Sequence, residues 1–136
     1  MCRVSCLLRF GTMLYSLGMR QKTIFIIEDE PGIRDFLSRL LELEGYKTIT
    51  ASNGHSALEM LKDMTAPDLI LLDVVMPEMN GIEFMNALKA DHVLVTIPVA
   101  IVSAYDQPKG ADGAKTFIKK PVDINALLKV IKEWCG

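Results

Sequence analysis

The sequence predicts an α/β fold in which helices cover both faces of a five-stranded parallel sheet. Short apolar runs alternate along the chain with segments that carry apolar residues at helical spacing, a pattern typical of parallel sheets with right-handed crossovers. Three of the runs are continuously apolar, as in strands buried on both faces. Two others include polar residues, which favours the edges of the sheet. The strand order that satisfies these observations is 2-1-3-4-5, a flavodoxin-like, doubly wound arrangement.

The expected strands begin at Thr23 and recur along the chain. The continuously apolar runs are 24–27, 69–72 and 99–102, and the less apolar ones are 46–51 and 115–119. The apolar runs are therefore expected to form the interior of the sheet, where both faces are buried.

Four segments have the apolar spacing of helices that pack on a sheet. The first is expected to start at Asp29-Glu30-Pro31, because proline is favoured near the first helical position, and to end at Gly45. The residues expected to face the core are Ile33, Phe36, Leu37, Leu40 and Leu41 in the first helix, Ala57, Leu58 and Leu61 in the second, Ile82, Met85 and Leu88 in the third, and Ile124, Leu127, Leu128 and Ile131 in the last.

The composition limits the classes of function. The chain has 136 residues, which suits one domain, and its net charge of -2 gives no general attraction to nucleic acid or to an anionic membrane. No apolar run approaches the roughly 20 residues that span a bilayer. The odd number of cysteines (Cys2, Cys6 and Cys135) has no metal-finger spacing, which favours a reducing cytoplasm.

The N-terminal segment differs from the rest of the chain. Residues 1–21 are expected to form a poorly ordered extension, and residues 22–136 the domain itself. Arg9 and Gly11 interrupt the apolar stretch, so the segment does not fit a signal peptide. Met19 is a possible natural start, because the patterned sequence begins directly after it.

Polar residues follow the predicted strands at one edge of the sheet. Glu28 and Asp29 come after the first strand, Asp73 ends the third, Ser103 ends the fourth, and Lys120 follows the fifth. The carboxyl ends of parallel strands meet at one edge, and sites in such sheets lie there, near the switch point between the first and third strands. We therefore expect these residues to converge, although each alone could be a helix cap, a turn residue or a surface charge.

The expected cluster suggests a specific chemistry. Three neighbouring carboxylates repel one another, and a hard cation such as Mg²⁺ relieves that repulsion. The cation could orient a phosphoryl group for attack by Asp73 as a carboxylate nucleophile. Lys120 would supply a positive charge to the phosphoryl oxygens, and Ser103 a hydroxyl hydrogen bond.

Four segments at this edge resemble the receiver domains of response regulators in two-component signalling, including the chemotaxis regulators. They are 26–30, 71–77 with Gly81, 98–104 and 117–121, and the similarity extends from about Thr23 to Trp134 in the order of the family.

The resemblance implies a role for each residue of the cluster. Asp73 matches the phosphorylated aspartate, Asp29 a direct Mg²⁺ ligand, and Glu28 its partner that often acts through water. The backbone carbonyl of Val75 would complete the protein ligands. Ala104 matches the small residue that leaves room for a phosphodonor.

Other matches concern the switch that follows phosphorylation. Ser103 and Phe117 match its hydroxyl and aromatic positions. Of two adjacent lysines, Lys120 rather than Lys119 is expected to contact the phosphoryl group, because it precedes Pro121 and because neighbouring strand residues point in opposite directions. The resemblance also implies a cis Lys120–Pro121 bond.

One segment departs from the family pattern. Receivers usually have a full helix between the fourth and fifth strands, but here the chain offers only Ala104 to Asp112, with Pro108 and Gly110. Both residue types disfavour a regular helix. The fourth helix is therefore expected to be shortened or missing, and the usual output surface to be altered.

The function predicted in this way is that of a signalling switch and not of a conventional enzyme. It would take a phosphoryl group from a sensor histidine kinase or a histidine phosphotransfer protein, catalyse only its own phosphorylation and dephosphorylation, and bind an unknown downstream protein. Neither nucleic acid nor membrane is an expected partner. Two alternatives are an unphosphorylated interaction module on the same fold and a metal-dependent phosphatase, which would need a second acid–base group beyond Asp73.

Overall fold

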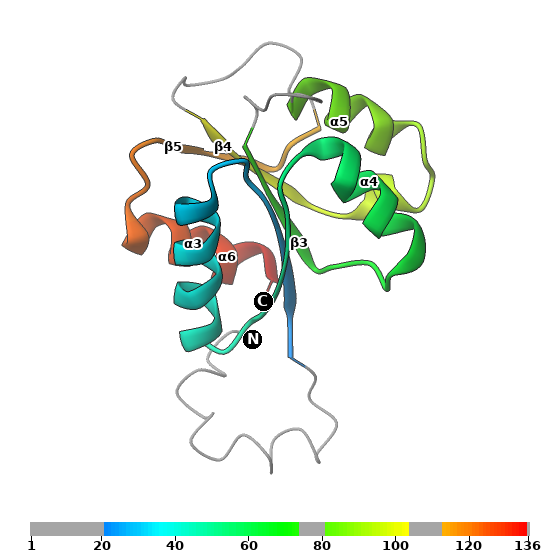
Figure 1. Cartoon of the computed structure of the whole chain (residues 1–136). Coiled ribbons are helices and arrows are strands. Elements are labelled where there is room, and N and C mark those ends of the chain that lie inside the picture. The colour runs from blue at the N-terminus through cyan, green and yellow to red at the C-terminus, as the bar shows by residue number, and fades with distance from the viewer. Residues whose placement is uncertain (1–20, 74–80, 104–112, 136) are drawn as a thin grey trace.

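The computed structural model describes residues 21–73, 81–103 and 113–135. In this part of the chain, five parallel strands form one sheet with the order β2-β1-β3-β4-β5 (Figure 1). This order confirms the predicted topology. The strands are β1 (Thr23–Ile27), β2 (Lys47–Ala51), β3 (Leu69–Asp73), β4 (Val99–Ser103) and β5 (Thr116–Lys119).

Helices cover both faces of the sheet (Figure 1). Residues of α3 and α6 pack on one face, and residues of α4 and α5 pack on the other. A 3-10 turn, η2, lies between α5 and β4. The bounds are α3 (Pro31–Leu43), α4 (Gly54–Asp63), α5 (Gly81–Lys89), η2 (Leu94–Thr96) and α6 (Ile124–Cys135).

Alternate residues of each central strand enter different layers of the core. In β1, Phe25 and Ile27 pack on the side of α4 and α5, whereas Ile24 and Ile26 pack on the side of α3 and α6. All five residues of β3 and of β4 are buried, whereas β2 and β5 are only partly buried. This contrast confirms that the mixed runs form the edges of the sheet.

Local signals fix the first two helices. Pro31 is the first residue of α3, and the Glu30 side chain accepts a hydrogen bond from the Gly32 N–H at 3.4 Å. Gly45 follows the helix with φ 97°, a conformation that favours glycine. At the start of α4, Asn53 Oδ1 accepts a hydrogen bond from the Ser56 N–H at 2.7 Å. Each cap satisfies a backbone N–H that the helix leaves free.

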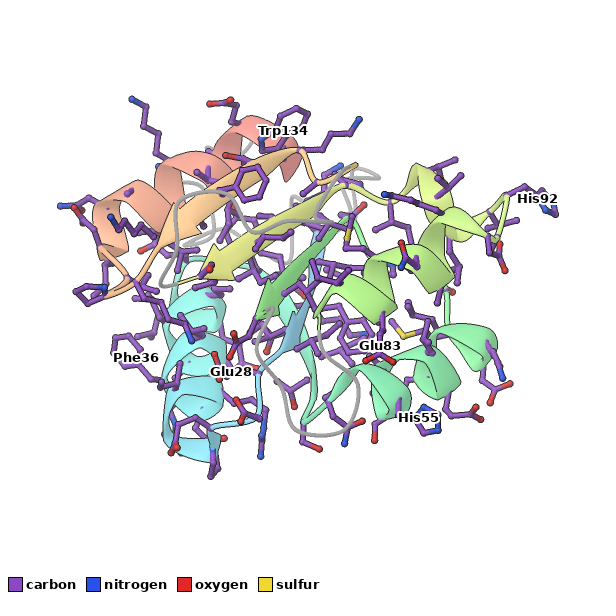
Figure 2. The ribbon with its side chains drawn as sticks, turned by 90° about the horizontal axis from the view of Figure 1, so that it is seen from above. Glu28, Phe36, His55, Glu83, His92 and Trp134 are labelled. Atoms are coloured by element: carbon purple, nitrogen blue, oxygen red, sulfur yellow. The ribbon has the colours of Figure 1, made fainter. Side chains whose placement is uncertain are left out.

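Fewer residues of α3 and α6 are buried against the sheet than the sequence predicts. Leu37 and Leu41 are buried, but Ile33 is 39% and Phe36 is 50% exposed. Phe36 projects from the outer side of α3 in Figure 2. Ile124 at the start of α6 is also 39% exposed. Apolar spacing marks the face of a helix, whereas the neighbouring sheet covers only its central rows.

Several expectations fall on residues that lie outside the described part of the chain. These are the extension at 1–21, apart from Gln21, and the shortened fourth helix at 104–112. The Gln21 side chain donates a hydrogen bond to the Gly45 carbonyl at 3.1 Å. Across the described ranges, none of the helices has the length and apolar character that a membrane span requires.

Candidate functional site

The pairing of β1 with β3 brings two acidic residues together at the carboxyl edge of the sheet. Ile27 lies opposite Leu72 in the parallel register, so Glu28 and Asp73 occupy neighbouring strand ends. Figure 2 looks down on this edge and shows Glu28 near the centre, whereas His55 and His92 lie at the periphery. The acidic residues are therefore adjacent in space because of the strand order, although they are far apart in the sequence.

Three carboxyl groups form a compact cluster at this edge. One carboxylate oxygen from each of Glu28, Asp29 and Asp73 lies within 4.8 Å of the others. Glu28 is 3% and Asp73 is 4% exposed, whereas Asp29 is half-buried. Burial of like charges at such short range is unfavourable unless a positive charge or a proton compensates them.

Lys120 supplies part of that compensation. Its Nζ lies 3.2 Å from Asp73 Oδ2 and 3.9 Å from Glu28 Oε1. The Lys120 N–H also donates to the Ser103 carbonyl at 2.7 Å, which ties the end of β5 to β4. The lysine thus reaches the cluster from a strand that is not adjacent to β3.

The backbone and side chain of Glu28 are both held in place. Its N–H donates to the Ala51 carbonyl of β2 at 3.1 Å, and its Oε2 accepts from the Glu30 N–H at 3.2 Å. Burial of the Glu28 carboxyl, reinforced by the neighbouring Asp73 charge, raises its pKa from 4.5 to about 7. The ionised form of this cluster is therefore short of positive charge, even with Lys120 beside it.

The donor atoms of the cluster suit a hard divalent cation. All three are carboxylate oxygens, which Mg²⁺ and Ca²⁺ prefer over nitrogen or sulfur ligands. Asp29 is the most accessible of the three residues, so a cation bound here could keep open positions toward solvent. The residues present therefore fit the magnesium site that the sequence predicts.

Ser103 and Phe117 lie on β4 and β5, the two strands that follow β3 in the sheet. Ser103 is buried at the end of β4, which is the strand beside β3. Phe117 lies in β5 opposite Ile101 and packs against the core on the side of α4 and α5. Ser103 therefore lies at the edge that carries the carboxylates, as expected, whereas Phe117 is the second residue of its strand. The switch roles of both residues stay predictions.

The structure also distinguishes the two adjacent lysines. Lys119 is an exposed residue at the end of β5, whereas Lys120 has its amine at the carboxylate cluster. The Lys120–Pro121 peptide bond is cis, as the sequence resemblance implied. The predicted contributions of the Val75 carbonyl and of Ala104 fall outside the described residues.

Arg34 is a site residue that the sequence reasoning missed. Its Nη1 donates to the Glu28 carbonyl at 2.9 Å and lies 3.5 Å from the Asp29 carbonyl oxygen. The available signal was its place in the second turn of a helix that starts directly after the acidic pair. From that position a long side chain can reach back to the strand end.

Comparison with known proteins agrees with this geometry. Residues 24–132 match the response regulator receiver domain family. The polar-differentiation response regulator DivK of Brucella anthropi is 35% identical over 121 residues, which cover 85% of this chain and 97% of that protein. DivK of Brucella ovis is 34% identical over the same coverage.

Solved structures show the same architecture. The signal receiver domain of a histidine kinase from Syntrophus aciditrophicus has a TM-score of 0.76 and 35% identity, covering 84% of this chain and 89% of that one. The response regulator TrrA from Thermotoga maritima, solved in complex with Mg²⁺-BeF, has a TM-score of 0.74 and 27% identity, covering 84% and 99%. The chemotaxis protein CheY4 from Vibrio cholerae has a TM-score of 0.77 and 26% identity, covering 85% and 99%.

Proposed function

Because this chain belongs to the response regulator receiver domains, the phosphoryl-accepting switches of two-component signalling, we propose that Asp73 is its phosphoacceptor. The observation that supports this assignment is the position of its carboxylate. Asp73 is the last residue of β3, and one of its carboxylate oxygens lies within 4.8 Å of an oxygen from each of the two other carboxylates. Its Oδ2 also lies 3.2 Å from Lys120 Nζ. A phosphoryl group at Asp73 would thus lie between a site suited to a cation and a fixed ammonium group.

We assign Mg²⁺ to the site formed by Glu28, Asp29 and Asp73. A bound Mg²⁺ supplies positive charge that neutralises the phosphoryl oxygens and the cluster itself. Asp29 is the proposed direct ligand because it is the accessible carboxylate, and Glu28 its buried partner. The Val75 carbonyl stays a predicted fourth ligand. The presence of Mg²⁺-BeF in the TrrA structure supports the same chemistry here.

The proposed reaction moves one phosphoryl group from a phosphohistidine to Asp73. The Asp73 carboxylate oxygen attacks the phosphorus and forms an O–P bond as the N–P bond of the phosphohistidine breaks. The electron pair of the broken bond stays on the imidazole nitrogen of the donor. Lys120 Nζ lies 3.2 Å from Asp73 Oδ2, and a carboxylate nucleophile carries no proton that a base would have to remove. Water later attacks the acyl phosphate, which restores the carboxylate and releases inorganic phosphate.

Lys120 and Ser103 would then act on the phosphorylated form. In the structure Lys120 pairs with the Asp73 carboxylate, and we propose that it transfers this interaction to a phosphoryl oxygen. The Ser103 hydroxyl, at the end of the neighbouring strand, would donate to another oxygen, and Phe117 would change its packing in response. These changes alter the surface around β4 and β5 and thereby the affinity for a downstream protein.

The proposed phosphodonor is a sensor histidine kinase or a histidine phosphotransfer protein. The proposed location is the cytoplasm, where a donor phosphorylated from ATP is available and where the three cysteines can stay reduced. Residues 22–136 are the proposed receiver unit, and the family match over 24–132 supports that boundary.

Phosphorylation by acetyl phosphate with Mg²⁺, followed by intact mass measurement, tests the assignment. The wild-type chain should gain one phosphoryl group, and Asp73→Asn should gain none. Asp35→Asn, an exposed carboxylate on α3, is the matched control and should behave like the wild type. A phosphoryl group that persists in Asp73→Asn would place the acceptor elsewhere.

A further inference from the structure

We propose that Arg34 is a positioning residue for the metal site, acting through the backbone of the acidic pair. This inference rests on the proposed Mg²⁺ site. The Arg34 guanidinium reaches back from the second turn of α3 to the strand end of β1. Its Nη1 donates to the Glu28 carbonyl at 2.9 Å and approaches the Asp29 carbonyl at 3.5 Å. Arg34 therefore contacts the main chain of two of the three carboxylate residues, and within the described ranges none of its hydrogen bonds goes to a carboxylate.

These contacts close the connection between β1 and α3. The Arg34 N–H donates to the Glu30 carbonyl at 2.9 Å, and the Glu30 N–H donates to the Glu28 carboxylate at 3.2 Å. Backbone and side chain of Arg34 thus hold the connection from Glu28 to Glu30 against the start of the helix. The side chains of Glu28 and Asp29 project from this connection, so its conformation decides where their oxygens lie.

Asp29 depends most on this support. Glu28 is buried and is also bonded to β2 through its N–H, whereas Asp29 is half-buried beyond the strand end. A direct metal ligand must be held in position before the cation binds, or part of the binding free energy is lost in ordering it. The 2.9 Å bond from Arg34 to the Glu28 carbonyl, which is part of the peptide group that leads into Asp29, provides this order. The longer 3.5 Å approach to the Asp29 carbonyl adds to it.

The charge of Arg34 and its hydrogen bonds have opposite effects on a bound cation. The guanidinium is positively charged near the cluster, so electrostatic repulsion alone would weaken Mg²⁺ binding. The planar guanidinium, however, presents several N–H donors in a fixed geometry, which a lysine ammonium on a flexible stem cannot reproduce. If Arg34 positions the metal ligands, removing its side chain should weaken Mg²⁺ binding. If it acts only through its charge, removing it should strengthen Mg²⁺ binding.

Titration calorimetry with Mg²⁺ alone separates the two roles. We expect Arg34→Ala to weaken Mg²⁺ binding about tenfold, the lower end of what residues supporting metal ligands contribute. Arg34→Lys keeps the charge and should also weaken binding, because it loses the guanidinium geometry. Arg39→Ala removes an exposed arginine from the same helix and should leave Mg²⁺ affinity within about twofold, as expected for a surface charge in high dielectric.

A kinetic measurement adds a second test. With acetyl phosphate as donor, Arg34→Ala should raise the Mg²⁺ concentration for half-maximal phosphorylation by the same factor as in calorimetry. The rate at saturating Mg²⁺ should stay near the wild-type rate, because Arg34 does not touch the reacting atoms. A general loss of structure would instead also lower the rate at saturating Mg²⁺. Should Arg34→Ala fail to fold in EDTA, Arg34→Lys and Arg34→Gln provide the comparison.

Two results would overturn the inference. Unchanged or tighter Mg²⁺ binding in Arg34→Ala, or wild-type affinity in Arg34→Lys, would show that the guanidinium hydrogen bonds do not position the metal ligands. Failure of the proposed function looks different, because the wild-type chain itself would then bind no Mg²⁺ and accept no phosphoryl group.

Discussion

The two edges of the sheet treat their carboxyl groups in opposite ways. At the carboxyl edge, burial and the neighbouring Asp73 raise the pKa of Glu28 to about 7. In the connection that leads to the start of β4, the N–H groups of Leu94 and Val93 lower the pKa of Asp91 below its usual 3.8. One edge thus disfavours its negative charge, whereas the other stabilises it with hydrogen bonds.

Further contacts at the amino edge have the same character as those of Asp91. Asp68 Oδ2 accepts from the Thr23 N–H at 2.8 Å, and the Asp68 N–H donates to the Thr23 carbonyl at 2.8 Å. These bonds join the starts of β1 and β3, whose other ends carry Glu28 and Asp73. Hydrogen bonds therefore stabilise the pairing of β1 with β3 at its amino end. At the carboxyl end of the same pair, like charges repel each other where a cation and a phosphoryl group are expected. Four substitutions test this contrast.

The largest effect is expected for Lys120→Met in the metal-free protein. The change leaves two buried carboxylates without their ammonium partner, so we expect the free energy of unfolding at pH 8 to fall by about 2 kcal/mol, less than for a fully buried pair. Urea unfolding in EDTA measures this, and Mg²⁺ should restore part of the loss. Lys129→Met, which removes an exposed lysine of α6, should change stability by less than about 0.5 kcal/mol. Equal losses in both variants would contradict the contrast.

Glu28→Gln should have the second largest effect, in the stabilising direction. The folded chain binds the Glu28 proton more tightly than the unfolded chain, so this group makes metal-free stability fall as the pH rises from 4.5 through about 7. The neutral variant lacks that fall and should be more stable than the wild type at pH 8 by about 1–2 kcal/mol.

Urea unfolding in EDTA at two pH values checks this prediction. At pH 5 the advantage of Glu28→Gln should be small, because the wild-type carboxyl is then mostly protonated in the folded chain. Asp73 and Lys120 face Glu28, and both remain in the variant. A constant difference between pH 5 and pH 8 would argue against the raised pKa.

Asp68→Ala probes the opposite edge and should have a smaller effect. It removes the acceptor of the Thr23 N–H, which should cost about 1 kcal/mol of unfolding free energy, the usual value for one hydrogen bond. Asp68→Asn keeps an acceptor oxygen and should lose less. Phosphorylation by acetyl phosphate should be unaffected in both variants, so a slower reaction would show that the two edges are coupled.

The smallest effect is expected for Asp91→Asn on the exposed turn before η2. Because the folded-state pKa of Asp91 is lowered, its stabilising contribution is present above 3.8 and is lost as the pH falls through the folded-state value. The thermal midpoint of the variant should therefore be slightly lower than that of the wild type at pH 7, and the two should approach each other in acid. A gap that widens in acid would contradict this sign.

The fold could be predicted from the sequence because a strand that is buried on both faces of a sheet consists almost entirely of apolar residues. Runs such as 69–72 and 99–102 are continuously apolar, and the structure buries every residue of β3 and β4. The strand order alone predicted that four polar residues converge, because the carboxyl ends of parallel strands lie at the same edge of the sheet. These residues are Glu28, Asp73, Ser103 and Lys120.

Other features depend on tertiary geometry that periodicity does not contain. Ile33 and Phe36 have the spacing of core residues but lie beyond the width that the sheet covers. Phe84 in α5 is fully buried although it was not among the residues expected to face the core. The contact of Arg34 with two carbonyls needs a long side chain to fold back along its own helix, a path that no residue pattern specifies.

The pairing of β1 with β3 has a consequence for folding. Glu28 and Asp73 become neighbours only through this pairing, which joins segments separated by a helix, a strand and a second helix. Bringing such distant segments together costs loop entropy that only the packed fold offsets, so an unfolded chain offers no such cluster. A cation that binds the cluster therefore binds only the folded chain and raises its stability by mass action, by about 2.7 kcal/mol when its concentration is one hundred times the dissociation constant. A cation at this site would in this way also reduce the fraction of unfolded chain that is open to proteolysis.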